Sequence, residues 1–174
     1  MNESIYAPWR TEFILGRREK GCVFCTRYKR KTDREDFILY RGRHNFILLN
    51  LYPYNSGHVL IIPNRHISTL TRMRPAERTE LMELAAACEI IMKDRLKPQG
   101  LNMGFNFGGA GGAGIRDHLH LHVVPRWTGD TNFMPVICDT RVNSVDLRVT
   151  YDILLPAFEK LAKRKKIGGQ KISI

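Results

Sequence analysis

The pattern of apolar positions along the chain predicts short strands interrupted by one long helix. Hydrophobic runs at residues 37–40, 45–50 and 57–63 are rich in β-branched and aromatic residues and are bounded by Gly, Pro or Asn. This is typical of consecutive strands. Two further runs, at residues 101–107 and 118–125, are also predicted to be strands.

Apolar residues at helical spacing predict the main helix across residues 75–95. Pro75 suits its first turn, and Pro98 follows its end. A second helix is expected within residues 144–166, broken or kinked near Pro156 because proline cannot donate the helical hydrogen bond. The order of strands, helix, strands and helix predicts an α+β fold, with a mostly antiparallel sheet of about five strands and two main helices.

Length and composition are those of one globular domain. The 174 residues are 43% hydrophobic and 26% charged, which suffices for a buried core. We expect a single domain over residues 1–174, with a basic N-terminal segment (1–36), a core (37–162) and a basic tail (163–174). No apolar run approaches the roughly 20 residues that cross a bilayer, and the first residues lack a secretory pattern. A cytoplasmic protein without membrane contact is therefore expected.

The chain is strongly basic. It contains 28 Lys and Arg against 17 Asp and Glu, a net charge of +11. Such an excess favours anionic partners such as nucleotides, nucleic acid or acidic lipid headgroups. The alternative is a solvated surface that only keeps the protein in solution.

Three histidines carry the clearest chemical signal. His118, His120 and His122 alternate with apolar residues, so on a strand all three point to one face, with neighbours roughly 7 Å apart. Imidazoles can act as nucleophiles, acids, bases or metal ligands near neutral pH. The Gly-Ala run at residues 108–114 precedes them, and its exposed backbone N–H groups could cradle phosphate oxygens.

These motifs resemble those of the histidine triad (HIT) superfamily of nucleotidyl hydrolases and transferases. The run HLHLHVV at residues 118–124 matches the family's alternating histidine motif. The segment from Asn50 to Pro63, with its Gly57-His58 pair, and the Cys-x-x-Cys at residues 22–25 also match. The extension PRWTGDTNFMPVI is most similar to the bacterial branch that acts on diadenosine tetraphosphate, which includes phosphorylases.

The resemblance implies roles for individual residues. His120 would attack the α-phosphorus and form a nucleotidyl-histidine, His122 would contact phosphate oxygens, and His118 completes the catalytic set. The carbonyl that follows the nucleophile is expected to orient its ring. Many members have Gly-Gln where this chain has Gly114 and Ile115, and Arg116 is a candidate replacement. The expected nucleotide- and phosphate-binding residues are Asn50, Asn106, Gly112, Gly114, Phe46, Leu48 and Trp127, of which Trp127 could instead serve packing.

A structural zinc ion is also expected. In the related galactose-1-phosphate uridylyltransferases, equivalent residues bind zinc, which implies the ligand set Cys22, Cys25, His66 and His118. Two sulfurs and two imidazole nitrogens suit tetrahedral zinc. The alternative is a pair of reduced thiols or a disulfide, with His66 on the surface. No organic cofactor is expected.

The motifs are compatible with several functions. The favoured reaction is phosphorolysis of diadenosine tetraphosphate to ADP and ATP, with inorganic phosphate as acceptor. Hydrolysis of the same substrates, or of nucleoside phosphoramidates and adenylyl conjugates, would use the same nucleophile. A nucleotide- or RNA-binding module is the non-enzymatic alternative, which the complete triad disfavours. The resemblance also implies a homodimer.

Overall fold

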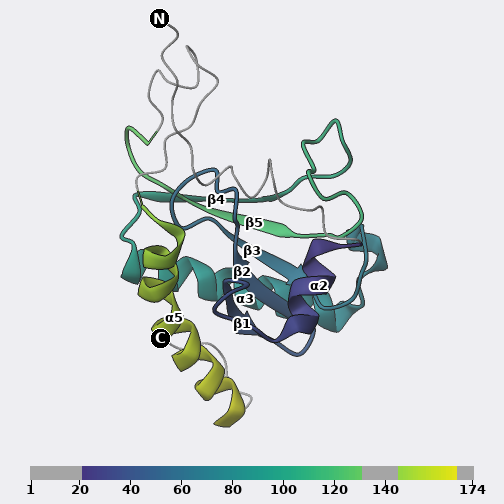
Figure 1. Cartoon of the computed structure of the whole chain (residues 1–174), viewed down its shortest axis with the longest axis horizontal. Helices are drawn as coiled ribbons and strands as arrows, with labels where there is room; N and C mark the ends of the chain where they lie inside the picture. Colours follow the sequence, from purple (N-terminus) through teal and green to yellow (C-terminus); the bar gives the residue numbers. More distant parts are fainter. Residues whose placement is uncertain (1–20, 131–144, 168–174) are drawn as a thin grey trace, which may run out of the picture.

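The computed structural model describes residues 21–130 and 145–167. The chain forms one five-stranded sheet in the order β1-β2-β3-β5-β4, and every neighbouring pair is antiparallel. This confirms the predicted α+β class and the strand number (Figure 1). The strands are β1 (Ile38–Arg41), β2 (Asn45–Leu49), β3 (Val59–Pro63), β4 (Gly100–Phe105) and β5 (Leu121–Arg126).

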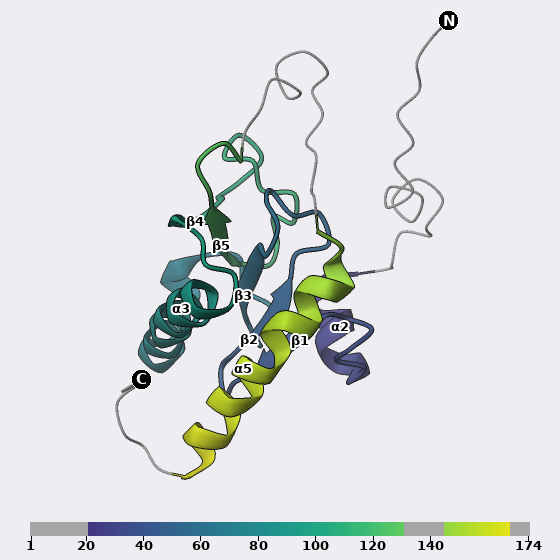
Figure 2. The ribbon, with the colours of Figure 1, turned by 90° about the vertical axis from the view of Figure 1, so that its left-hand side faces the viewer.

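Within the described residues, three helices and one 3-10 turn, η2 (Leu70–Arg72), accompany the sheet. The helices are α2 (Val23–Arg30), α3 (Pro75–Arg95) and α5 (Leu147–Ile167). Helices α3 and α5 pack on one face of the sheet, whereas α2 lies on the other face (Figure 2). The predicted bounds of α3 are confirmed: Pro75 occupies its first turn, and Glu77 accepts a hydrogen bond from the N–H of Arg74 at 2.7 Å.

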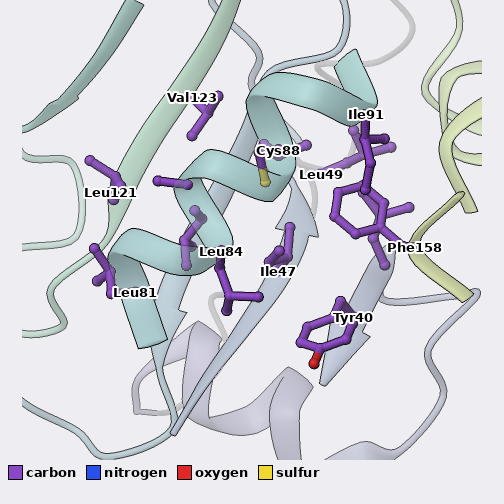
Figure 3. Packing of buried hydrophobic residues seen from close by; sticks show 14 of the residues in the cluster. Tyr40, Ile47, Leu49, Leu81, Leu84, Cys88, Ile91, Leu121, Val123 and Phe158 are labelled. Atoms are coloured by element: carbon purple, nitrogen blue, oxygen red, sulfur yellow. The ribbon is translucent and has the colours of Figure 1, made fainter. Parts of the chain in front are cut away.

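Strand alternation divides the core into two layers. In β2, Ile47 and Leu49 face α3 and α5, while Phe46 and Leu48 face α2. The larger layer joins α3 to β2, β5 and α5 (Figure 3). Its labelled members include Leu81, Leu84, Cys88, Ile91, Leu121, Val123 and Phe158. The opposite layer is smaller, and it supports the histidines described below.

Two segments differ from the expectations. No helix was predicted in the basic N-terminal segment, but residues 23–30 form α2, whose one buried residue, Phe24, anchors it to the sheet. Helix α5 continues through Pro156 without a break. Proline inside a helix costs about 3 kcal/mol, and buried Leu154 and Phe158 lie on either side of it in the core, so their packing offsets that cost.

The remaining boundaries differ from the predictions by a few residues. The largest shift is at β5, which begins at Leu121 and not at His118. The backbone before β5 bonds elsewhere, since the N–H of Leu119 donates to the carbonyl of Ile67 at 2.6 Å. None of the described helices combines the length and the apolar character that a membrane span requires.

Candidate active site and metal site

The sheet brings the three histidines to the face that α2 covers. His122 lies on β5, with Leu60 of β3 opposite it on one side and Gly104 of β4 on the other. His118 and His120 precede the strand but keep its alternation, because Leu119 between them joins the opposite core layer. All three imidazoles are buried, and the ring centroids of His120 and His122 are 4.8 Å apart.

The hydrogen bond of His120 determines which of its nitrogens can react. Nδ1 lies 2.8 Å from the carbonyl oxygen of His118, which can only accept, so Nδ1 carries the proton. Nε2 therefore keeps its electron pair. The carbonyl that orients the His120 ring belongs to His118 and so precedes the candidate nucleophile, whereas the expected carbonyl follows it. Burial lowers the pKa of His120, and a neutral ring with a free Nε2 pair is the nucleophilic form.

His122 is held in the complementary state by a fourth histidine. Nδ1 of His58 receives hydrogen bonds from the Asn50 amide (3.2 Å) and from the Tyr54 backbone N–H (3.0 Å). The Asn50 amide is oriented by the N–H of Tyr52, which donates to its oxygen at 3.1 Å. With Nδ1 accepting, the proton of His58 must sit on Nε2, where it is donated to Nδ1 of His122 at 2.9 Å.

These hydrogen bonds make Nδ1 of His122 an acceptor, so the proton of the neutral His122 ring lies on Nε2. That atom is buried and has no hydrogen-bond partner among the described residues. A buried donor without a partner is costly, and a phosphate oxygen would satisfy it. Burial, with the neighbouring histidines as a second cause, lowers the pKa of His58 to about 3 and that of His122 to about 4. Both rings are therefore neutral at physiological pH.

The glycine loop connects to the triad through two side chains. Asn106, at the end of β4, donates to the Tyr54 hydroxyl at 3.3 Å and reaches the Gly112 carbonyl at 3.5 Å. Gly108 and Gly112 adopt positive φ angles of 67° and 81°, which glycine tolerates without strain. Gly112 and Gly114 are both exposed. The Arg116 guanidinium lies against Gly109, where a Cβ atom would stand only 2.8 Å from Nη2.

The residues predicted for the nucleoside pocket are not gathered at one surface. Phe46 and Leu48 are fully buried beneath α2, where the rings of Tyr28 and Phe46 lie 4.9 Å apart. Asn50 is bonded to His58. Trp127 is half-buried just beyond β5, and its backbone N–H donates to the Asp130 carboxylate at 3.1 Å. Residues 131–137 of the extension lie outside the described residues.

The four predicted zinc ligands come together. The ligand atoms of Cys22, Cys25, His66 and His118 all lie within 4.8 Å of one another. Nε2 of His118 faces the Pro63 carbonyl at 2.8 Å and so carries the proton, which leaves the Nδ1 electron pair 3.3 Å from the Cys22 sulfur. His66 Nδ1 lies 3.5 Å from the Cys25 sulfur. This donor set and tautomer fit a tetrahedral zinc ion, which could hold α2 against the sheet.

Two neighbours of the candidate metal ligands could not be found from the sequence. Arg65, next to His66, makes a bidentate ion pair with Glu77 of α3 at 2.6 and 2.8 Å. Phe24, between the two cysteines, lies edge-on to both His118 and His120, with ring centroids 5.6 and 5.2 Å away. The Cys-x-x-Cys spacing is about one helical turn, a signal that could have indicated α2.

Comparison with known proteins agrees with this geometry. The family model described as "HIT domain" matches residues 31–129, more than half of the chain. The protein therefore belongs to the HIT domain family, which confirms the resemblance seen in the histidine motif.

Individual relatives extend the comparison. The AP-4-A phosphorylase of Mycobacterium tuberculosis H37Rv is 39% identical over 123 residues, which cover 71% of this chain and 63% of that protein. A hypothetical histidine triad nucleotide-binding protein of Sulfolobus tokodaii superposes with a TM-score of 0.67 at 27% identity, over 87% of this chain and 100% of the other. A Zn-bound histidine triad family protein of Mycobacterium smegmatis gives 0.62 at 25% identity, over 83% and 97%.

Proposed function

We propose that the protein transfers a nucleotidyl group from a dinucleoside polyphosphate, through a covalent intermediate on His120, to inorganic phosphate. The observation that carries this proposal is the pairing of two opposite imidazole states. His120 presents an electron pair at Nε2, and His122 presents an N–H donor without a partner among the described residues. A nucleophile beside a donor for phosphate oxygens suits displacement at phosphorus.

In the first step, Nε2 of His120 attacks the α-phosphorus of diadenosine tetraphosphate. The new N–P bond forms as the bond from phosphorus to the bridging oxygen breaks, and ATP leaves. The ring becomes cationic because Nδ1 keeps its proton, so its hydrogen bond to the His118 carbonyl strengthens as charge develops. The His122 Nε2–H donates to an oxygen of the transferring group.

In the second step, an oxygen of inorganic phosphate attacks the nucleotidyl-histidine. The N–P bond breaks, ADP is released, and His120 recovers its electron pair. Water in place of phosphate would release AMP. The choice of phosphate as acceptor is supported by the net charge of +11 and by the M. tuberculosis relative named AP-4-A phosphorylase.

Product analysis tests this function. Diadenosine tetraphosphate is incubated with the full chain, with and without phosphate, and the nucleotides are separated. We expect ADP and ATP only when phosphate is present, and no turnover by His120→Ala. The control His44→Ala removes a histidine outside the cluster and should keep full activity. AMP and ATP without phosphate would establish a hydrolase, and no conversion would redirect the search to phosphoramidates or adenylyl conjugates.

We also propose that zinc occupies the Cys22, Cys25, His66 and His118 cluster as a structural ion. Support comes from the ligand atoms lying within 4.8 Å of one another and from the Zn-bound histidine triad protein of M. smegmatis. The ion would supply no chemistry to the reaction.

We also propose that the protein forms a homodimer through the edge of the sheet. Strand β4 pairs with β5 on one edge and with no other described strand. Met103 on β4 and Met82 on α3 are 41% and 62% exposed. Light scattering should give twice the chain mass, and Met103→Asp should reduce it if this edge is the contact.

A further inference from the structure

An aromatic side chain that the reaction above does not use lies directly on the triad. The ring of Tyr54, in the turn between β2 and β3, is stacked on the imidazole of His122, with centroids 5.4 Å apart and planes 10° from parallel. The same ring is 4.7 Å from that of His58. Among the described aromatic residues other than histidine, Tyr54 alone contacts His122 in this way.

The turn that carries Tyr54 is anchored at several points. The Tyr54 backbone N–H donates to His58. The next residue, Asn55, donates its amide to the Pro125 carbonyl at 3.0 Å and to the Asp130 carboxylate at 2.8 Å. Tyr54 is 44% exposed, yet its backbone N–H is bonded to His58 and the side chain of the next residue, Asn55, is bonded to the end of β5. The stacked ring is therefore placed by the fold.

The hydroxyl of Tyr54 reaches the second part of the site. It accepts a hydrogen bond from the amide of Asn106, which immediately precedes the glycine-rich segment 107–114. The same amide approaches the Gly112 carbonyl. One side chain thus contacts the donor histidine through its ring and the residue leading into the glycine loop through its hydroxyl.

We propose that Tyr54 is a positioning residue that aligns the polyphosphate-binding loop with the donor histidine, an inference that rests on the proposed function. The hydroxyl holds Asn106 where the loop meets the polyphosphate. The ring fixes the plane of the His122 imidazole, so that Nε2–H meets the transferring group at the required angle.

The two contacts have different kinetic consequences. Loss of the hydroxyl weakens an interaction made equally in the ground state and the transition state, so it raises KM and leaves kcat unchanged. Loss of the Tyr54 ring allows the His122 imidazole to rotate. Its Nε2–H is then misoriented toward the transferring group, which lowers kcat. Each contact is worth about threefold to tenfold in the corresponding constant.

The experiment compares Tyr54→Phe with Tyr54→Leu in steady-state kinetics on diadenosine tetraphosphate. Tyr54→Phe keeps the ring and should raise KM about threefold to tenfold with kcat within twofold of the wild type. Tyr54→Leu should show the same rise in KM and also lose about threefold to tenfold in kcat. The control is Val149→Ala, which shortens a side chain of α5 at a position that is 50% exposed. This control should behave like the wild type.

A binding measurement separates this inference from the proposed reaction. Calorimetry compares the affinity of diadenosine tetraphosphate for His120→Ala with that for the double variant His120→Ala/Tyr54→Phe, neither of which depends on turnover. We expect about threefold to tenfold weaker binding by the double variant. If the wild type shows no turnover but this difference persists, the reaction is wrong and the role of Tyr54 in holding Asn106 stands.

Three results would overturn the inference. The first is that both Tyr54 variants match the Val149→Ala control. The second is that Tyr54→Phe lowers kcat as much as Tyr54→Leu, since the ring would then contribute nothing of its own. The third is equal binding by the single and double variants. Urea unfolding of each variant excludes general destabilisation as the cause of any kinetic change.

Discussion

Lowering the pH should destabilise this fold because the His58 imidazole is buried in its neutral form. Its side chain is fully buried, and burial, with the neighbouring His122 and His120 as further causes, lowers its pKa to about 3. In the unfolded chain a histidine has a pKa of about 6.5. Between these two values the unfolded chain binds a proton that the folded protein does not. The free energy of unfolding therefore falls as the pH falls below 6.5 and is recovered above it.

The size of this effect follows from the two pKa values. Each pH unit below 6.5 removes about 1.4 kcal/mol until the folded pKa is approached. From pH 7 to pH 5, His58 alone should lower the free energy of unfolding by about 2 kcal/mol. This is a large share of the roughly 5–15 kcal/mol that stabilises a typical domain.

Urea unfolding at pH 8, 7, 6 and 5 checks this value by comparing the wild type with His58→Asn. Asparagine can accept from the Tyr54 N–H and donate to His122 but does not titrate. Contributions from the metal ligands are common to both proteins and cancel in the difference. Between pH 7 and pH 5, the free energy of unfolding of the wild type should fall by about 2 kcal/mol more than that of the variant. From pH 8 to pH 7 the two free energies should change equally. An equal fall in the free energy of unfolding of both proteins below pH 6.5 would refute the assignment of His58 as a buried neutral group.

Two further predictions concern the metal and the β1–β2 turn. Cys25→Ser should reduce bound zinc, measured by mass spectrometry of the dialysed protein, well below one ion per chain, whereas Cys88→Ala, which alters a buried cysteine outside the cluster, should retain it. Undiminished zinc in Cys25→Ser would contradict the proposed ligand set. Glu80→Ala should cost about 2 kcal/mol in urea unfolding, because this carboxylate accepts backbone hydrogen bonds from residues 43–45 at 2.6–2.9 Å. The exposed neighbour Glu83→Ala should stay within about 0.5 kcal/mol of the wild type, and an equal loss in both would rule out the contribution of these bonds.

Local sequence patterns were sufficient for most of the fold. The bounds of α3 followed from its apolar spacing and from Pro75, and the five strands followed from β-branched runs between turn residues. Helix α2 could not be found in this way. It has eight residues and buries only Phe24, and a short helix is marginal without tertiary contacts. Its stability comes from the sheet face beneath it, which is built from residues far away in the chain.

For the site too, local sequence patterns predicted some features, whereas others depend on segments that are distant in the chain. Alternation in the histidine run predicted the common face of His118, His120 and His122 correctly. The tautomers could not be predicted, because they depend on contacts between distant segments. His58 and His122 are 64 residues apart, and nothing in the neighbourhood of either one indicates the other. Asn50 is predicted to belong to the nucleoside pocket, and the fold adds that its amide helps to set the proton position of His58, which the sequence did not indicate.

The side chain and the backbone carbonyl of His118 have two different roles in the site. Its imidazole faces the two cysteines, while its carbonyl orients the His120 ring. Substitution changes only the first of these directly, since every residue has the carbonyl. A cysteine at position 118 could thus preserve the class of metal ligand together with the acceptor for His120, and would give up the bond to Pro63. The identity of the residue would be constrained by the proposed metal, and the path of the backbone by the orientation of the His120 ring.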